Sequence, residues 1–242
     1  DISYKYTVYM CQAISFASRL PVMNQTKKPI KRRSLTVEKI VQKALELADK
    51  DGFESLSMRK LASALDATAM SLYNHVANKD DLLDLMLDRV VAEFESPVVG
   101  GDWEEMMRRR AYSMRQALLR HQWAPTLLIS KIALGEAILR DIDASVGCLV
   151  TGGFTYAQAD WAKNAIDSHV YGYTMQELNY PVDPDEYQAA AAQFLPMISK
   201  IDYPFMYGAA MQIIDGEYDG LTQFSFGLEL ILDGLKRWRA IA

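Results

Sequence analysis

Apolar residues recur at helical spacing through most of the chain. In the segment 37–48 they stand at positions i, i+3, i+4, i+7, i+8 and i+11, which form one face of a helix. These residues are Val37, Ile40, Val41, Ala44, Leu45 and Ala48. Thr36 is placed to cap the start of this helix and Gly52 to end it. No convincing pair of segments alternates as neighbouring strands do, so the pattern predicts an all-α protein.

Short helices follow the first one. Ser57 is placed to cap a second helix, Thr68 a third, and Asn78 a longer fourth. In the third helix Leu72 and Val76 lie four residues apart and are expected to point inward. The fourth carries the apolar stripe Leu83, Met86, Leu87, Val90 and Phe94. The pattern therefore predicts a head of three short helices packed on the start of a fourth.

The rest of the chain reads as longer helices. They are predicted over 102–121, 124–131, 134–151, 155–179, 184–195, 204–214 and 219–240. No internal repeat or low-complexity tract interrupts them.

The head has the parts of a helix-turn-helix. Two short helices are joined by a turn at Asp66 and Ala67, and the second turns polar and aromatic groups outward, as a helix that enters the major groove of DNA does. The segment 37–90, most specifically "DGFESLS", "LSMRKLA" and "SLYNHVANKDDLL", resembles the tetracycline-repressor-like (TetR) family of transcriptional regulators. More weakly, "FSFGLELILDGL" at 224–235 resembles the closing helix of that family's C-terminal domain.

The resemblance implies a fold and a division into parts. The expected fold is an all-α homodimer, whose N-terminal three-helix head is joined by the long fourth helix to a larger helical ligand-binding and dimerisation domain. We interpret residues 1–26 as an extension outside the working fold, 27–82 as the DNA-binding domain and 83–242 as the ligand-binding and dimerisation domain.

Charge supports a DNA-binding head. Residues 24–79 hold 11 Lys and Arg against 6 Asp and Glu, whereas residues 80–242 hold 13 against 24. A basic head on an acidic body suggests that only the head approaches a polyanion. A soluble surface with uneven charge is the alternative explanation. The basic arm "KKPIKRR" at 27–33 would add a nonspecific or minor-groove contact.

The predicted DNA contacts combine resemblance and chemistry. The resemblance places base reading at Ala69, Met70 and Ser71, and a base or phosphate contact at Arg59. Other head side chains can donate hydrogen bonds to phosphate. The whole predicted set is Ser57, Arg59, Thr68, Ala69, Met70, Ser71, Tyr73, Asn74, His75 and Lys79. Asp66 stands where the family commonly has a turn glycine, although Asp tolerates the left-handed conformation better than most residues.

By the same resemblance, the body should hold an effector and a partner subunit. The predicted effector-binding residues are Met114, Leu118, His121, Trp123, Leu127, Trp161, His169, Tyr173 and Met175. The predicted dimer interface is Ala162, Ala165, Ile166, Phe224, Leu228, Ile231 and Leu235. Each residue taken singly could instead belong to the core of one subunit. We expect a small hydrophobic or aromatic effector that shifts the body to a form whose heads are wrongly spaced for DNA.

Other classes of protein fit the sequence less well. A helical di-iron enzyme needs Glu-x-x-His pairs, but Leu72, Leu118 and Ile166 stand three residues before the three histidines. Phosphate-loop, zinc-protease and Gly-x-Ser-x-Gly patterns are missing. Neither a catalytic role nor a cofactor or metal is expected. A helical scaffold that binds DNA nonspecifically, without a ligand, stays open as the alternative.

Composition sets the expected setting. Cys11 and Cys148 match no metal or redox spacing, which indicates a reducing cytoplasm. No apolar run reaches the roughly 18 to 20 residues that span a bilayer. The expected partners are therefore an operator in double-stranded DNA, a small effector and a second copy of the chain, without a membrane.

Overall fold

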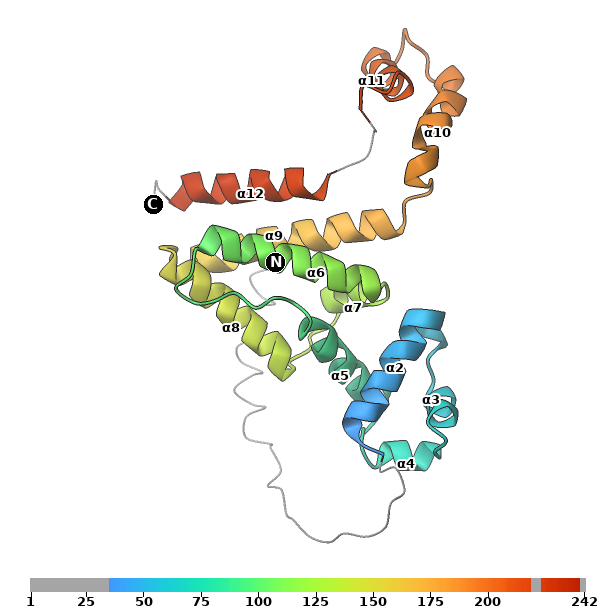
Figure 1. Cartoon of the computed structure of the whole chain (residues 1–242), viewed down its shortest axis with the longest axis vertical. Helices are drawn as coiled ribbons and strands as arrows, with labels where there is room; N and C mark the ends of the chain where they lie inside the picture. The colour runs from blue at the N-terminus through green and yellow to red at the C-terminus, as the bar shows by residue number, and fades with distance from the viewer. Residues whose placement is uncertain (1–34, 219–222, 240–242) are drawn as a thin grey trace. The chain divides into compact units, whose positions relative to one another are not determined.

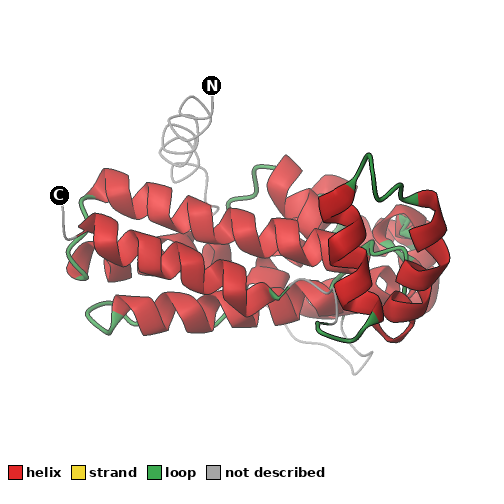
Figure 2. Ribbon diagram, turned by 90° about the horizontal axis from the view of Figure 1, so that it is seen from above, coloured by secondary structure: helices red, strands yellow, loops and turns green. Residues whose placement is uncertain are grey.

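The structure, a computed structural model, describes residues 35–218 and 223–239. Within these residues the regular structure is entirely helical, and Figure 2 shows the helices joined by loops. The α-helices, labelled in Figure 1, are α2 (Val37–Asp51), α3 (Met58–Ala64), α4 (Ala69–Tyr73), α5 (Lys79–Val91), α6 (Trp103–Arg120), α7 (Ala124–Ser130), α8 (Glu136–Thr151), α9 (Tyr156–Leu178), α10 (Tyr187–Phe194), α11 (Pro204–Ile214) and α12 (Phe224–Arg239). Short 3-10 turns are η2 (Phe53–Ser55), η3 (Pro184–Glu186) and η4 (Leu195–Met197). The predicted all-α class is confirmed.

The predicted helix starts are confirmed by their capping hydrogen bonds. Thr36 Oγ1 accepts from Lys39 N at 3.3 Å, and Ser57 Oγ accepts from Lys60 N at 3.2 Å. Asn78 Oδ1 accepts from Asp81 N at 2.8 Å. These oxygens satisfy amide groups that have no partner within the first turn of a helix.

The longer helices follow the predicted pattern with small differences. The segment predicted from 184 begins as the 3-10 turn η3 before it becomes α10, and η4 follows α10. The last helix was predicted from 219, but Gln223 is not helical and α12 begins at Phe224. Residues 219–222, like the predicted extension 1–26 and the arm 27–33, lie outside the described residues.

The chain forms two compact units, of which the first reaches Asp160 and the second begins at Trp161. In the first unit α3 packs against α2 and α4, and α5 contacts α2, α6, α7 and α8 (Figure 1). Most of the predicted inward residues of the head and of α5 are buried there, including Ile40, Leu72, Val76, Met86 and Leu87. The head thus closes around its own apolar core, and α5 also contacts the helices that follow.

In the second unit, aromatic side chains hold α9 against α12. The Phe224 ring lies 5.1 Å from the His169 ring and 5.3 Å from the Tyr173 ring, measured between centroids. His169 Nε2 also lies 3.0 Å from the Phe224 carbonyl oxygen. A side chain at Gly227 would come within 2.4 Å of His169, so glycine permits this close approach.

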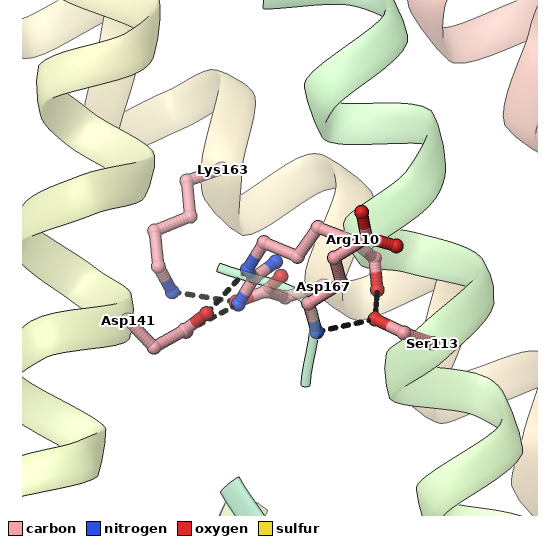
Figure 3. Close-up of polar contacts among 6 residues, drawn as sticks. Arg110, Ser113, Asp141, Lys163 and Asp167 are labelled. Carbon is pink, nitrogen blue, oxygen red and sulfur yellow. Dashed lines mark hydrogen bonds and ion pairs between the residues drawn. The ribbon is translucent and has the colours of Figure 1, made fainter. Parts of the chain in front are cut away.

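Two pairs of buried charged groups lie on the longer helices (Figure 3). On α6, Arg110 donates from Nε and Nη2 to the two carboxylate oxygens of Asp141 on α8, at 2.8 and 2.7 Å. On α9, Lys163 Nζ lies 2.6 Å from Asp167 Oδ2, one helical turn away. A two-point contact satisfies a buried guanidinium and carboxylate together, so the Arg110 pair fixes α6 on α8.

Candidate nucleic-acid interface

Helix α4 is short, and its fixed position depends on two residues. Leu72 and Val76 are buried, whereas Met70 is 73% and Tyr73 47% exposed. Thr68 caps the helix, accepting from Ser71 N at 3.2 Å. A five-residue helix is not stable alone, so its packing against α3 must hold it in place. The arrangement leaves the opposite side of α4 free for a partner.

The turn before α4 has an unusual backbone. Asp66 has φ of 51°, a left-handed conformation, and no other non-glycine residue in the described parts of the chain has a positive φ. Asp and Asn enter this region more readily than other side chains. Ala67 N then donates to Ala62 O at 2.9 Å, which fixes the direction in which α4 leaves α3. The turn therefore closes without a glycine.

All ten predicted DNA-contacting residues lie between Ser57, the N-cap of α3, and the start of α5. Seven are exposed, namely Ser57, Arg59, Thr68, Met70, Tyr73, Asn74 and His75, and Ala69, Ser71 and Lys79 are partly exposed. Lys79 Nζ lies 4.5 Å from the centre of the Phe53 ring, a contact the sequence did not suggest. Their contact with DNA stays a prediction.

The nine predicted effector residues fall into three groups. Met114 and Leu118 are buried on α6, and Leu127 lies partly buried on α7. Trp161, His169, Tyr173 and Met175 lie on α9 in the second unit. His121 and Trp123 form the third group, and both contact Asp49 on α2 of the head. The effector role of all nine stays a prediction.

His121 and Trp123 contact acidic residues that sequence reasoning missed. His121 Nδ1 lies 2.8 Å from Asp49 Oδ1 and its Nε2 lies 3.1 Å from Glu93 Oε1. Trp123 Nε1 donates to the same Asp49 oxygen at 2.7 Å. Burial acts to raise the pKa of Glu93, but hydrogen bonds from Arg120 and His121 outweigh it and lower the pKa. No local pattern could have found these contacts, because they join residues 28 to 74 positions apart.

Most of the predicted dimer residues are buried within a single chain. These are Ala162, Ile166, Phe224, Leu228 and Leu235. Ala165 is exposed and Ile231 partly exposed. The predicted stripe on α12 is apolar, but much of it is already buried within the single chain. Its role in a dimer stays a prediction.

Other chemistries find little support. Among the described residues no three His, Cys, Asp or Glu side chains are grouped to hold a metal ion. Burial raises the pKa of the Cys148 thiol, which disfavours the reactive thiolate; Cys11 lies outside the described residues. No helix in the described ranges is long and apolar enough to cross a bilayer.

The fold and the head define an all-helical protein of the helix-turn-helix class, and comparisons give its family. The model described as "Bacterial regulatory proteins, tetR family" matches residues 40–86. The model described as "Tetracyclin repressor-like, C-terminal domain" matches residues 97–239. The chain belongs to the TetR family of transcriptional regulators. The predicted resemblance and the predicted class, a regulator rather than an enzyme, are confirmed.

Individual relatives agree. The HTH-type transcriptional repressor DrrR1 of Streptomyces coeruleorubidus is 32% identical over 84% of this chain and 78% of its own length. The class D tetracycline repressor protein of Escherichia coli is 28% identical over 84% of this chain and 89% of its own. The Streptomyces coelicolor protein ActR, solved in complex with actinorhodin, superposes with a TM-score of 0.71 at 28% identity, over 85% of this chain and 99% of ActR.

Proposed function

We propose that this protein is a repressor that binds a palindromic operator as a homodimer and leaves it when a small hydrophobic or aromatic effector binds. One observation carries the proposal: α4 is anchored by Leu72 and Val76, while its opposite side holds exposed groups that no core covers. Repression is supported by the relatives, which are named as repressors. A regulator of this kind acts in the cytoplasm.

In the proposed complex, α4 enters the major groove. Met70 and Ala69 offer apolar contact to thymine methyl groups, and Asn74 and Arg59 offer hydrogen bonds to bases or phosphates. Tyr73, with its exposed ring, would donate from its hydroxyl to phosphate. Base recognition and positioning on the DNA thus come from different side chains of one small surface. With the DNA-binding domain proposed to end at residue 82, effector binding and dimerisation belong to the rest of the chain.

For the dimer we propose the outer faces of α9 and α12. Phe226 is 68% and Leu230 56% exposed, and they lie four residues apart on the side of α12 away from Leu228. Exposed apolar side chains at helical spacing are typical of a helix that packs against another subunit. Trp161 is also largely exposed, on α9. A dimer is needed to present two heads to half-sites one DNA turn apart, about 34–36 Å.

The effector is proposed to bind among helices α6 to α8, where Met114, Leu118 and Leu127 supply apolar surface. Helix α5 is the proposed lever to the head, because it contacts α7 and α8 directly. Asp88 on α5 accepts from Ile138 N at the start of α8, at 3.0 Å. Lys131, after α7, lies 2.8 Å from Asp84 on α5. Movement of α7 or α8 would therefore move α5, whose first residues belong to the head.

Selection of bound fragments from random DNA tests this function. A palindromic consensus, protected as one short footprint, is expected. Uniform coating of DNA without a consensus would instead support the alternative of a nonspecific scaffold. Release of the selected fragment by hydrophobic or aromatic compounds, screened by fluorescence anisotropy, tests the effector separately. A bound compound that leaves operator affinity unchanged would contradict the proposed coupling.

A further inference from the structure

The head is held to the following helices at two separate joints. At the α5 joint, Asp88 accepts from Ile138 N, and a side chain at Gly135 would come 2.0 Å from the Asp88 carboxylate. Lys131 completes this joint by its contact with Asp84. At the α2 joint, His121 at the end of α6 meets Asp49 near the end of α2. The two joints differ in chemistry, because only the second contains a histidine.

The geometry of the α2 joint depends on protonation. Both ring nitrogens of His121 face carboxylate oxygens, at 2.8 Å from Asp49 and 3.1 Å from Glu93. A neutral imidazole has one N–H, whereas an ionised carboxylate can only accept. Both contacts are hydrogen bonds together only when the ring is an imidazolium. After loss of the proton, one ring nitrogen would carry a lone pair facing a carboxylate oxygen, and the two would repel each other.

The joint extends towards the proposed DNA surface. Trp123 donates to Asp49, and its ring stacks on Phe53 with centroids 5.8 Å apart. Phe53 in turn lies under the ammonium group of Lys79. A continuous set of contacts therefore links the end of α6 to the first residue of α5.

Water can reach the joint, so its proton can exchange. A cavity of about 350 Å³ opens beside it, lined by Gln42, Leu45, Asp49, Arg89, Ala92, Glu93 and His121. The charged groups around the imidazole are Asp49 on α2, Arg89 on α5, Glu93 just after α5, and Arg120 on α6. Arg120 lies 2.5 Å from Glu93, and because the pKa of Glu93 is lowered, this carboxylate stays ionised near neutral pH.

We propose that His121, as an imidazolium between Asp49 and Glu93, is the positioning residue that fixes the head on α6, so that operator binding weakens as the ring loses its proton. A head released at this joint is freer to move, and DNA binding must then order it again, which lowers affinity. The inference rests on the proposed function, because its readout is operator affinity. Histidine is the side chain that ordinarily changes charge between about pH 5 and 8.

The test uses the full chain and the operator recovered by selection, at constant ionic strength between about pH 6 and 8. Wild-type affinity is expected to fall about tenfold across this range, as loss of one charge-assisted hydrogen bond would produce. His121→Gln should bind weakly with a flat pH profile. His121→Arg, which keeps a cation with several donors, should bind tightly with a flat profile.

Two matched controls separate this joint from other causes. His75→Gln removes the exposed histidine of the predicted DNA surface and should lower affinity, while most of the wild-type slope remains. Lys131→Ala weakens the α5 joint and should lower affinity without changing the slope. If His121→Gln does not fold, Asp49→Asn, which removes one carboxylate, should also flatten the profile.

The outcomes distinguish this inference from the proposed function. A wild-type chain that selects no DNA sequence overturns both. A selected operator whose affinity keeps the same slope in folded His121→Gln or Asp49→Asn overturns only the joint, as does a slope that disappears in His75→Gln. Ring ¹⁵N shifts give a readout without DNA. An imidazolium at the acidic end of the range supports the joint, and a ring neutral throughout contradicts it.

Discussion

The head and the second unit both expose large apolar side chains, but the residues around these side chains differ in kind. On α4, Met70 and Tyr73 stand beside Thr68 and Asn74, so apolar surface alternates with hydrogen-bonding groups. In the second unit, Ile201 and Phe205 are each 91% exposed, and α11 has Ile213 as its buried residue. The exposed fraction of a side chain does not by itself indicate the partner.

Neighbouring groups make the difference. DNA offers phosphates and base edges, which a surface recognises with donors and with limited apolar contact. A protein subunit offers apolar side chains, which pack against a continuous apolar surface. The head is therefore suited to DNA, and the exposed side chains of α11 and α12 are suited to another protein surface. Four predictions test this contrast, in order of decreasing effect.

Leu72→Ala should give the largest effect, because it removes the anchor of α4 and leaves a cavity in the head. Burial of Leu72 predicts a loss of about 2–5 kcal/mol in the free energy of unfolding and loss of operator binding. Urea unfolding and anisotropy measure the two quantities. Met70→Ala, at an exposed position of the same helix, should change stability by less than about 0.5 kcal/mol. Equal destabilisation by the two changes would show that α4 is not anchored as described.

The double change Phe226→Ser and Leu230→Ser should separate the subunits. If both residues lie at the centre of the proposed interface, their truncation should raise the dissociation constant about thirtyfold, or roughly 2 kcal/mol. Sedimentation equilibrium measures this constant, with exposed Asp233→Ser on the same helix as the control. A dimer whose dissociation constant is unaffected by the double change would place the interface elsewhere. A wild-type chain that stays monomeric at micromolar concentration would contradict the proposed dimer.

Arg59→Ala should weaken operator binding by about 1–2 kcal/mol, because it removes a charged donor at the start of α3. If Arg59 binds a phosphate, the slope of log affinity against log salt should also decrease by about one. Lys200→Ala, an exposed cation in the second unit, is the control. Titrations at several salt concentrations measure both effects, and unchanged affinity and slope would exclude Arg59 from the interface.

Asp66→Gly should have the smallest effect. Glycine adopts a φ of 51° without strain, so the head should gain up to about 1 kcal/mol against thermal unfolding. Asp66→Ala retains a β-carbon but loses the polar group and should be less stable than wild type. If Asp66→Gly is less stable than wild type, the aspartate side chain stabilises the folded head by more than the left-handed backbone conformation destabilises it.

The helices, caps and apolar core of the head could be predicted because their signals are local. Caps such as Thr36, Ser57 and Asn78 and the spacing of Leu72 and Val76 depend on residues within a few positions, and the structure confirms them. The contacts of His121 could not be predicted, since they depend on how α2 and α6 pack. Likewise, periodicity identified an apolar stripe on α12, but Phe224 and Leu228 are buried within the chain while Phe226 and Leu230 face outward.

The most direct test of the central claim is the operator affinity of the double variant Tyr73→Ala and Lys79→Ala, measured beside Tyr218→Ala and Lys200→Ala as exposed controls in the second unit. The account predicts that the first pair weakens binding by tenfold or more, at about 1 kcal/mol for each lost contact, while the protein stays folded and the control pair binds as wild type does. A folded double variant that binds its selected operator with full affinity would contradict the assignment of α4 and the start of α5 as the DNA-reading surface.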